Sequence, residues 1–369
     1  MSQNPSAPPR STRGVIRAIA ELRRGTPVVV KKDEAGIVVL ATEFAEDGLR
    51  PLTDLGLSPD LLAITGLRAA VLNIPPTGED AVVIALSSQI DGATIRSLAD
   101  PTSDLDHPMR GPFRLAQRAP GAATEALTLC KRARLLPAVV FAAVPVGEEA
   151  TAWAARHDLL VADAEAIARF EVETARTLTP ISGAQVPLAN AESTRIVAFR
   201  PADAGIEHVA VVVGAPHADA PVLVRLHSEC FTGDLLASLR CDCGDQLRGA
   251  IHLMHEAGAG VLLYLAQEGR GIGLINKLRA YTLQDQGYDT MEANRRLGFE
   301  DDERIFQPAA EMLRHLGFTS VRLLTNNPEK VAGLARLGID VVERVPHAFP
   351  PNNHNQRYLD TKARHGHKL

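Results

Sequence analysis

Three cysteines lie close together in the sequence and carry the strongest chemical signal in the chain. Cys230, Cys241 and Cys243 fall within fourteen residues and have polar and acidic neighbours. Thiolates suit zinc, and catalytic zinc sites take three protein ligands with an open fourth position, whereas structural sites take four. We therefore predict a zinc ion that activates water for attack on an electrophilic carbon. The alternative, a set of buried or free thiols, fits the isolated Cys130 better.

A glycine-rich loop follows a predicted strand at 261–265. It reads Gln267-Glu-Gly-Arg-Gly-Ile-Gly273. Glycines at a strand end let backbone amides approach an anion, and the Arg270 guanidinium can donate two parallel hydrogen bonds to phosphate oxygens. The loop is neither a Walker A motif nor a dinucleotide fingerprint, and a simple turn explains it equally well. Glu268 is unusual in a phosphate cradle, but its carboxylate suits the amino and imino edge of a guanine.

Two further polar segments occur later in the chain. Asp301-Asp-Glu-Arg304, taken alone, is most often a solvated loop. Thr325-Asn-Asn-Pro-Glu-Lys330 joins a predicted strand to a helix, with asparagine as the expected cap and proline at the first helical position. In α/β folds such a junction binds ligands, and a helix N-terminus favours phosphate. Lys330 can meet such a phosphate as a point charge. Together with the cysteines, these segments predict a zinc centre beside a nucleotide-phosphate site.

Alternating strand-like and helix-like segments must position these residues. The first half is predicted to hold strands at 28–30, 37–40, 81–85 and 138–144 and helices at 16–23, 124–133, 148–157 and 162–177. In the second half, we predict a β-hairpin from 208–214 and 222–226, a helix capped by Thr232 through 238, and a helix at 246–257. Strand 321–324, helix 328–337 and strand 339–342 then form a βαβ unit. The predicted fold is α/β (α+β), with two domains that are each a mixed sheet with flanking helices.

Length and composition limit the class of protein. A chain of 369 residues favours two domains, and the periodic pattern breaks near 177–190. A net charge of −5 argues against a general nucleic-acid or anionic-membrane binder. The longest apolar run, 135–146, contains two prolines and is too short to span a bilayer, and the N-terminus lacks the apolar segment of a signal peptide. We predict a cytoplasmic protein without nucleic-acid or membrane partners.

The motifs from about 180 to 369 resemble GTP cyclohydrolase II, the zinc enzyme that opens riboflavin synthesis. The matching segments are Arg225-Leu-His-Ser-Glu-Cys230, Ser238-Leu-Arg-Cys-Asp-Cys-Gly244, Gln267-Glu-Gly-Arg-Gly-Ile-Gly273, Asn276-Lys-Leu-Arg-Ala-Tyr281, Gln284-Asp-Gln-Gly-Tyr-Asp-Thr290, Glu292-Ala-Asn294, Leu323-Leu-Thr-Asn-Asn-Pro328 and Tyr358-Leu-Asp-Thr-Lys362. One departure is Ala266, where the family commonly carries arginine. The resemblance implies conversion of GTP to formate, pyrophosphate and 2,5-diamino-6-ribosylamino-4(3H)-pyrimidinone 5′-phosphate, with zinc and magnesium, in a homodimer.

The resemblance also implies a role for each matching site residue. It assigns zinc to Cys230, Cys241 and Cys243. It assigns contacts with GTP to Arg225, Leu226, His227, Ser228, Glu229, Gln246, Glu268, Gly269, Arg270, Thr290, Thr325 and Lys330. Asp302 matches the proton acceptor, Arg304 the nucleophile or stabiliser at the α-phosphate, and Tyr281 a tyrosine of the ring-opening step. Because a guanidinium has a pKa above about 12, we favour Arg304 as an electrostatic clamp.

The N-terminal half is similar to 3,4-dihydroxy-2-butanone 4-phosphate synthase in a degenerate form. Traces of that family include Asp91-Gly-Ala-Thr-Ile-Arg-Ser-Leu-Ala-Asp-Pro101. The family's acidic metal-binding stretch is reduced to Lys32-Asp-Glu-Ala-Gly-Ile-Val-Val39, its histidine is replaced by Ala123, and a strand glutamate is replaced by Ala142. We expect no synthase activity, and a role as scaffold, dimerisation surface or regulator.

These observations predict a disordered tail at 1–14, a synthase-like domain at 15–177 and a GTP cyclohydrolase II domain at 178–369. Two alternatives stay open. The first is a bifunctional enzyme that also makes the butanone phosphate, which the missing acidic cluster disfavours. The second is a non-catalytic GTP-binding regulator, which would require the loss of zinc-binding or catalytic residues that this sequence retains. A zinc-binding nucleic-acid module fits least, because the chain is acidic.

Overall fold

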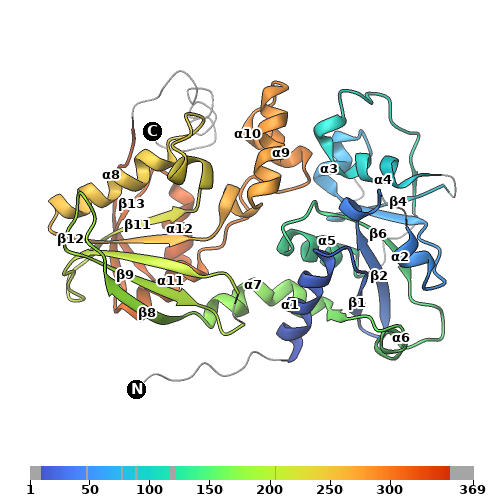
Figure 1. The fold of residues 1–369 in the computed structure, drawn as a ribbon, viewed down its shortest axis with the longest axis horizontal. Helices are drawn as coiled ribbons and strands as arrows, with labels where there is room; N and C mark the ends of the chain where they lie inside the picture. Colours follow the sequence, from blue (N-terminus) through green and yellow to red (C-terminus); the bar gives the residue numbers. More distant parts are fainter. Residues whose placement is uncertain are drawn as a thin grey trace. The chain divides into compact units, whose positions relative to one another are not determined.

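The computed structural model describes residues 10–46, 49–75, 78–87, 90–116, 121–203 and 205–349. These residues form two compact units. The N-terminal unit contains residues up to 170 together with Ile275–Glu303, and the C-terminal unit contains Glu171–Leu274 together with residues from 304 onward. Each unit holds a sheet with flanking helices (Figure 1). The predicted mixed α/β architecture is confirmed.

Seven strands form one sheet among the described residues of the N-terminal unit, in the order β5-β4-β3-β6-β2-β1-β7. They are β1 (Val28–Lys32), β2 (Ala35–Ala41), β3 (Leu61–Thr65), β4 (Ala81–Ala85), β5 (Arg114–Leu115), β6 (Ala138–Ala143) and β7 (Val161–Asp163). Only the β1–β7 pair is parallel, so the sheet is mixed. The central strands are rich in valine, isoleucine and alanine because they are buried.

Helices cover this sheet and extend the unit. They are α1 (Arg10–Leu22), α2 (Arg50–Thr53), α3 (Gly66–Val71), α4 (Gly92–Ala99), α5 (Ala123–Arg132), α6 (Ala150–Arg156), the first part of α7 (Ala164–Arg176), α9 (Leu274–Asp285) and α10 (Thr290–Arg296), with short 3-10 turns η1 (Thr42–Phe44) and η2 (Pro101–Ser103). Val15, Ala18 and Leu22 recur on one face of α1 and are fully buried in the core with residues of α5. Helical spacing therefore explains the docking of α1.

Seven strands also form one sheet among the described residues of the C-terminal unit, in the order β14-β13-β11-β12-β10-β9-β8. They are β8 (Thr179–Gln185), β9 (Thr194–Arg200), β10 (His208–Gly214), β11 (Val222–Ser228), β12 (Ala259–Leu265), β13 (Ser320–Leu324) and β14 (Asp340–Val345). β12, β11, β13 and β14 are mutually parallel, whereas β8, β9 and β10 pair antiparallel. The helices are α8 (Cys243–Glu256), α11 (Gln307–Leu316) and α12 (Pro328–Arg336), with a π-helical turn η3 (Phe231–Leu235) and a 3-10 turn η4 (Glu268–Gly271).

Alternation along the strands divides this unit into two cores, one on each face of its sheet. Val224 and Leu263 point to the face covered by α11 and α12. Their neighbours Leu223 and Leu262 point to the face covered by α8 (Figure 1). Successive side chains of a strand point to opposite faces, so both faces must be apolar when both are covered.

Most predicted elements occur within a few residues of their expected ends, and β13, α12 and β14 form the predicted parallel βαβ unit. The predicted hairpin is wrong. β10 and β11 do not pair, because β12 lies between them and bonds to both. The helix predicted after Thr232 is also wrong: a π-helical turn forms there, and the Cys230 thiol accepts its Gly233 N–H at 3.3 Å.

The expected chain divisions also differ from the structure. The segment 177–190, where the periodic pattern breaks, contains strand β8, and the two units divide between residues 170 and 171. Helix α1 begins at Arg10, so residues 10–14 are helical and not part of a disordered tail, while the first nine residues lie outside the described ones. Ile275–Glu303 groups with the N-terminal unit, although it lies inside the predicted cyclohydrolase domain. The motif at 358–362 lies outside the described residues.

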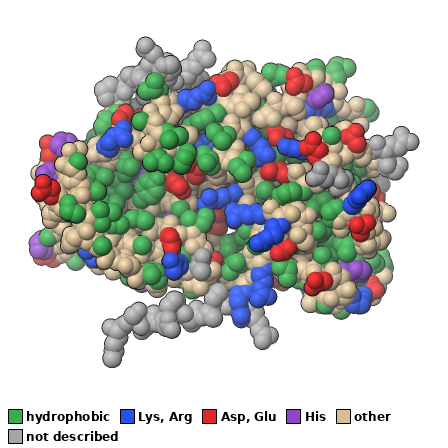
Figure 2. All heavy atoms as spheres, viewed as in Figure 1, with side chains coloured by type: hydrophobic (Ala, Val, Ile, Leu, Met, Phe, Trp, Pro, Cys, Tyr) green, Lys and Arg blue, Asp and Glu red, His purple; other side chains and the backbone are tan. Residues whose placement is uncertain are grey.

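The surface carries mixed charge. Figure 2 shows basic, acidic and hydrophobic side chains interspersed over the face that it draws, in line with the small net charge. In the described part of the chain, no helix has the length and apolar character needed to cross a bilayer.

Candidate metal and nucleotide site

The three predicted zinc ligands come together in the C-terminal unit. Cys230 follows β11, Cys241 lies in the loop before α8, and Cys243 is the first residue of α8. Their sulfur atoms lie within 4.8 Å of one another, and this is the one such cluster of candidate metal ligands in the residues that the structure describes. Cys230 Sγ and Cys241 Sγ are 3.7 Å apart. The loop and the helix start therefore place three soft ligands around one point.

The surroundings of the sulfur atoms fit a cation. Hydrogen bonding to the Cys230 thiol raises the pKa of Cys241 to about 11, and the same contact with Cys230 raises the pKa of Cys243. Packed thiols oppose one another's ionisation, and a bound cation offsets that repulsion. A Cβ atom at Gly233 would lie 2.7 Å from Cys241 Sγ and 3.0 Å from Cys230 Sγ. The turn needs glycine because any side chain would enter the space between the sulfur atoms.

Asp234 holds Cys230, the first of the three clustered cysteines, and no motif in the sequence predicted this role. Its carboxylate accepts hydrogen bonds from the backbone N–H of Cys230 at 3.0 Å and from the Tyr264 hydroxyl at 2.9 Å. Both of its oxygens lie 3.0 Å from His227 Nε2. The His227 ring stacks on Tyr264 with centroids 5.5 Å apart. The sequence places Asp234 between Cys230 and Cys241, which could have suggested a role at this site. Its hydrogen-bond partners are known only from the fold.

Apart from Thr290, the predicted nucleotide residues belong to the C-terminal unit, on or close to its parallel strands. β11, β12 and β13 are parallel neighbours, so their carboxyl ends meet at the same edge. Ser228 ends β11 and Glu229 follows it, and both are half-buried, whereas Arg225, Leu226 and His227 are buried within the strand. Ligands of open α/β sheets bind at this kind of edge.

The buried Arg225 and the half-buried Gln246 form a hydrogen-bonded group with His347, here called the brace. Arg225 Nη1 donates to the carbonyl of Leu324 at 2.9 Å, and its Nη2 donates to the side-chain oxygen of Gln246. Burial lowers the pKa of Arg225 to about 10. His347 Nε2 donates to the carbonyl of Gln246 at 2.8 Å. These contacts join β11, β13 and α8.

The glycine loop after β12 is tied to the turn η3 that follows Cys230. Glu268 is 3% exposed and accepts the backbone N–H of Phe231 at 2.6 Å and that of Gly269 at 3.0 Å. Gly269 and Arg270 both have φ of 62°, a conformation that glycine adopts freely and arginine rarely. Glu268 thus fixes the turn that presents Arg270 next to the segment following Cys230.

Thr325 and Lys330 are buried at the end of β13 and the start of α12. Lys330 Nζ donates to the carbonyl of Leu226 at 2.8 Å, which links α12 to β11. Asn327 caps α12 by accepting the Glu329 N–H, as predicted, and its own N–H donates to Thr325 Oγ1 at 3.0 Å. The helix start therefore lies beside β11, with its lysine directed back to that strand.

The predicted catalytic residues divide between the units. Arg304 belongs to the C-terminal unit, where its Nη1 donates to Ser228 Oγ at 3.4 Å. Tyr281, Thr290 and Asp302 belong to the N-terminal unit. Lys277 lies over the Tyr281 ring at 5.7 Å, Thr290 Oγ1 accepts from Gln284 at 3.3 Å, and Asp302 is exposed.

Two of the positions where a synthase would carry its histidine and strand glutamate hold alanine. Ala123 and Ala142 are buried in the core of the N-terminal unit. Lys32 Nζ forms an ion pair with Glu125 at 2.9 Å. The carboxylate nearest Ala123 in sequence is therefore paired with a lysine.

The fold and the cysteine cluster define a mixed α/β protein with a candidate metal centre, and comparisons specify the family. Residues 180–346 match the model of the GTP cyclohydrolase II family. A GTP cyclohydrolase-2 from Azospirillum brasilense is 52% identical over 98% of this chain and 97% of its own length. A riboflavin biosynthesis protein RibBA from Synechocystis is 36% identical over 94% of this chain and 69% of its own length. A GTP cyclohydrolase-2 from Haemophilus influenzae is 57% identical over 46% of this chain and 79% of its own length. The chain belongs to the GTP cyclohydrolase II family of enzymes.

Proposed function

We propose that this protein hydrolyses GTP to 2,5-diamino-6-ribosylamino-4(3H)-pyrimidinone 5′-phosphate, formate and pyrophosphate, the first step of riboflavin biosynthesis. The observation that carries the proposal is the convergence of Cys230, Cys241 and Cys243 within 4.8 Å, in a family member 52% identical to a GTP cyclohydrolase-2 along nearly its full length. We infer that these thiolates bind one zinc ion per subunit. When bound, zinc supplies Lewis-acid activation of water at neutral pH.

The protein's own groups prepare the site for this chemistry. Asp234 orients Cys230 through its backbone N–H, and supports of this kind fix the direction of a ligand. Glu268 holds the glycine loop against the segment after Cys230. On this proposal the sheet edge receives GTP through Arg225 to Glu229, Gln246, Glu268 to Arg270, Thr325 and Lys330, and Thr290 is a further GTP contact. Asp302 takes the role of proton acceptor, and Tyr281 serves the ring-opening step.

Arg304 acts in this proposal as an electrostatic clamp on the α-phosphate. Its guanidinium donates to Ser228 Oγ at the end of β11, so its charge is held at the proposed nucleotide edge. A guanidinium with a pKa above about 12 is a poor nucleophile but a good partner for phosphate oxygens. Magnesium would enter with the triphosphate, since Mg²⁺ is usually bound by substrate phosphates and one or two carboxylates.

The test is a measurement of formate and pyrophosphate release from GTP and magnesium, with and without a zinc chelator. We expect zinc-dependent release of both products. Cys241→Ser should lower zinc content and turnover by at least about a hundredfold, because a water-activating metal supplies several kcal/mol of stabilisation. Cys130→Ala is the matched control, since Cys130 is buried in the N-terminal unit away from the cluster, and it should keep both zinc and activity. No turnover of GTP by the zinc-loaded wild type would refute the proposed reaction.

A bifunctional enzyme is the second candidate, favoured by the similarity to the RibBA protein. We infer instead that the N-terminal half makes no butanone phosphate, because Ala123 and Ala142 replace the expected histidine and glutamate and Glu125 is paired with Lys32. Incubation with ribulose 5-phosphate and magnesium distinguishes the two. Formation of 3,4-dihydroxy-2-butanone 4-phosphate would establish the bifunctional enzyme.

GTP binding without turnover would instead indicate a regulator. A cytoplasmic location and a homodimer complete the proposal.

A further inference from the structure

A helical segment of the family-matched region folds with the other half of the chain. Ile275–Glu303, which includes nearly all of α9 and the whole of α10, lies within the matched residues 180–346 but belongs to the N-terminal unit. Leu283, Ala293, Leu297 and Phe299 are at most 1% exposed. The segment is therefore an integral, well-packed part of the N-terminal unit.

Arg279 of α9 is the centre of the first polar anchor. Its two terminal nitrogens each lie 3.1 Å from an oxygen of Glu43, and its Nε lies 3.3 Å from Asp100 Oδ2. The three side chains are each 14% exposed. Glu43 also accepts the backbone N–H of Leu136 at 2.7 Å. A bidentate arginine–carboxylate pair fixes direction as well as distance, so this contact sets the rotation of α9.

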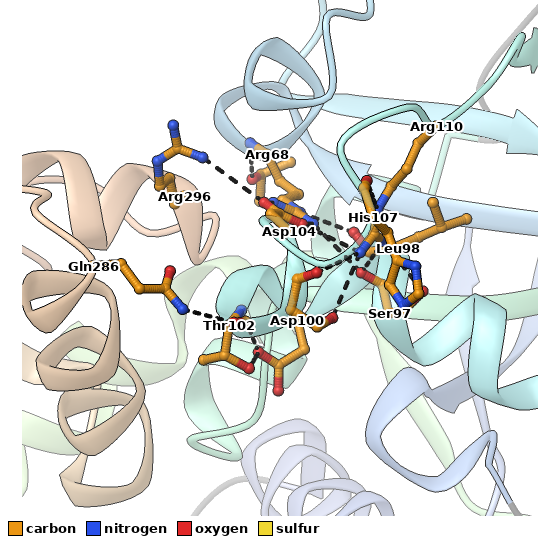
Figure 3. Close-up of polar contacts among 12 residues, drawn as sticks. Arg68, Ser97, Leu98, Asp100, Thr102, Asp104, His107, Arg110, Gln286 and Arg296 are labelled. Carbon is orange, nitrogen blue, oxygen red and sulfur yellow. Dashed lines mark hydrogen bonds and ion pairs between the residues drawn. The ribbon is translucent and has the colours of Figure 1, made fainter.

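A second anchor holds α10 and the turn before it, and its residues are drawn in Figure 3. Gln286 Nε2 donates to the carbonyl of Thr102 at 2.9 Å. Arg296 points to Asp104 at 3.8 Å. Asp104 in turn receives a bidentate pair from Arg68, at 2.6 and 2.8 Å, and Arg68 is only 1% exposed. The carboxylate that meets α10 is thus itself rigidly held.

A third anchor lies at the end of the segment. Lys131 Nζ is 2.6 Å from Glu303 Oε1. Gly298 has a φ of 85°, and a Cβ there would lie 2.7 Å from Thr65 Oγ1 and 3.0 Å from Pro137. The backbone of the turn after α10 therefore touches the end of β3 and the start of β6 directly.

We propose that the N-terminal unit serves the cyclohydrolase reaction by positioning α9 and α10, and that Arg279, Glu43 and Asp100 are its main positioning residues. Arg279 lies two residues before Tyr281 on the same helix, so its bidentate pair fixes the helix that carries this side chain. This inference rests on the proposed function, in which Tyr281 and Thr290 meet GTP. It gives a role to a synthase-like fold whose metal-binding residues are replaced.

The test compares Glu43→Gln and Asp100→Asn with wild type in the full-length, zinc-loaded protein. Arg96→Gln is the matched control, because Arg96 pairs with Glu46 on the surface of the same unit. We expect Glu43→Gln to lower kcat/KM for GTP roughly tenfold or more, since small displacements of reacting groups have effects of this size. Asp100→Asn should have a smaller effect of the same kind. Zinc content and the C-terminal unit's amide exchange should stay at the wild-type level, whereas amides of α9 and α10 should exchange faster.

Two outcomes would overturn the inference. The first is unchanged kinetics with faster exchange of α9 and α10, which would mean that the anchor is structural only. The second is unchanged exchange in Glu43→Gln, which would mean that the pair does not hold the helix. The exchange measurement needs no activity, so it also decides the anchoring if the wild type fails to turn over GTP, an outcome that refutes the proposed function separately.

Discussion

At the scale of single residues, the site depends on glycine and aspartate as much as on cysteine. Gly233 leaves room between the sulfur atoms, and Asp234 next to it accepts from the Cys230 backbone, Tyr264 and His227. A carboxylate with three partners is well satisfied, which allows it to be buried. The turn after Cys230 is thus shaped by two residues that are not among the predicted zinc ligands.

Gly233→Ala should weaken zinc binding roughly 10- to 100-fold, a loss typical of disturbed ligand orientation. The physical reason is the 2.7 Å approach of the new Cβ to Cys241 Sγ. Zinc affinity is measured by competition with a chromophoric chelator. Gly66→Ala is the control, because its Cβ would meet nothing closer than 3.7 Å. Equal zinc affinity in both variants would show that the sulfur atoms do not require the open space at Gly233.

At the scale of elements, parallel strands and the helices between them create the nucleotide edge. The brace of Arg225, Gln246 and His347 joins β11 to β13, α8 and the chain after β14. His347 N–H and C=O also bond to the Asn326 side chain at 3.0 and 2.7 Å. The segment after β14 is therefore fastened to the same edge.

This brace predicts a pH dependence of stability. Burial lowers the pKa of His347 from 6.5 to about 4. Between these values the unfolded chain binds a proton that the folded chain does not, so the free energy of unfolding falls as pH decreases from 6.5 toward 4. The contribution is at most about 3 kcal/mol and is fully present above pH 6.5. Denaturant unfolding at several pH values measures the free energy of unfolding. Its decrease from pH 6.5 to 4 should be smaller in His347→Asn than in wild type. The control His217→Asn, at an exposed histidine, should show the wild-type decrease.

At the scale of the whole molecule, an exposed apolar patch supports the proposed homodimer. The patch lies in the C-terminal unit, at and after the turn η3. It consists of Leu235, Leu236 and Leu239, which are 69, 62 and 58% exposed, together with Phe231 of the same turn at 41%. Clustered exposed leucines are typical of an association surface.

Leu236→Glu should therefore shift the protein from dimer toward monomer, because a charge in an apolar interface is costly. Sedimentation velocity over a range of concentrations measures the change. Val342→Glu is the control, since Val342 is 51% exposed on β14, an edge strand of the same unit's sheet. A wild-type monomer, or a dimer that survives Leu236→Glu, would contradict the assignment of this patch.

The sequence by itself determined the chemistry and most of the local structure. Cysteine spacing predicted the metal cluster, the Asn-Pro pair predicted the start of α12, and apolar periodicity predicted most strands and helices, because each of these signals is local. Motif order also predicted the family.

Tertiary structure alone decided the rest. The placement of β12 between β10 and β11 depends on strand pairing across the chain, which no short pattern encodes. The same holds for Asp234, whose partners come from separate strands, and for Arg279, whose carboxylates lie well over a hundred residues away in sequence. Local residue types predict the groups available for chemistry, whereas the partners of a buried charge are fixed only when distant segments pack together.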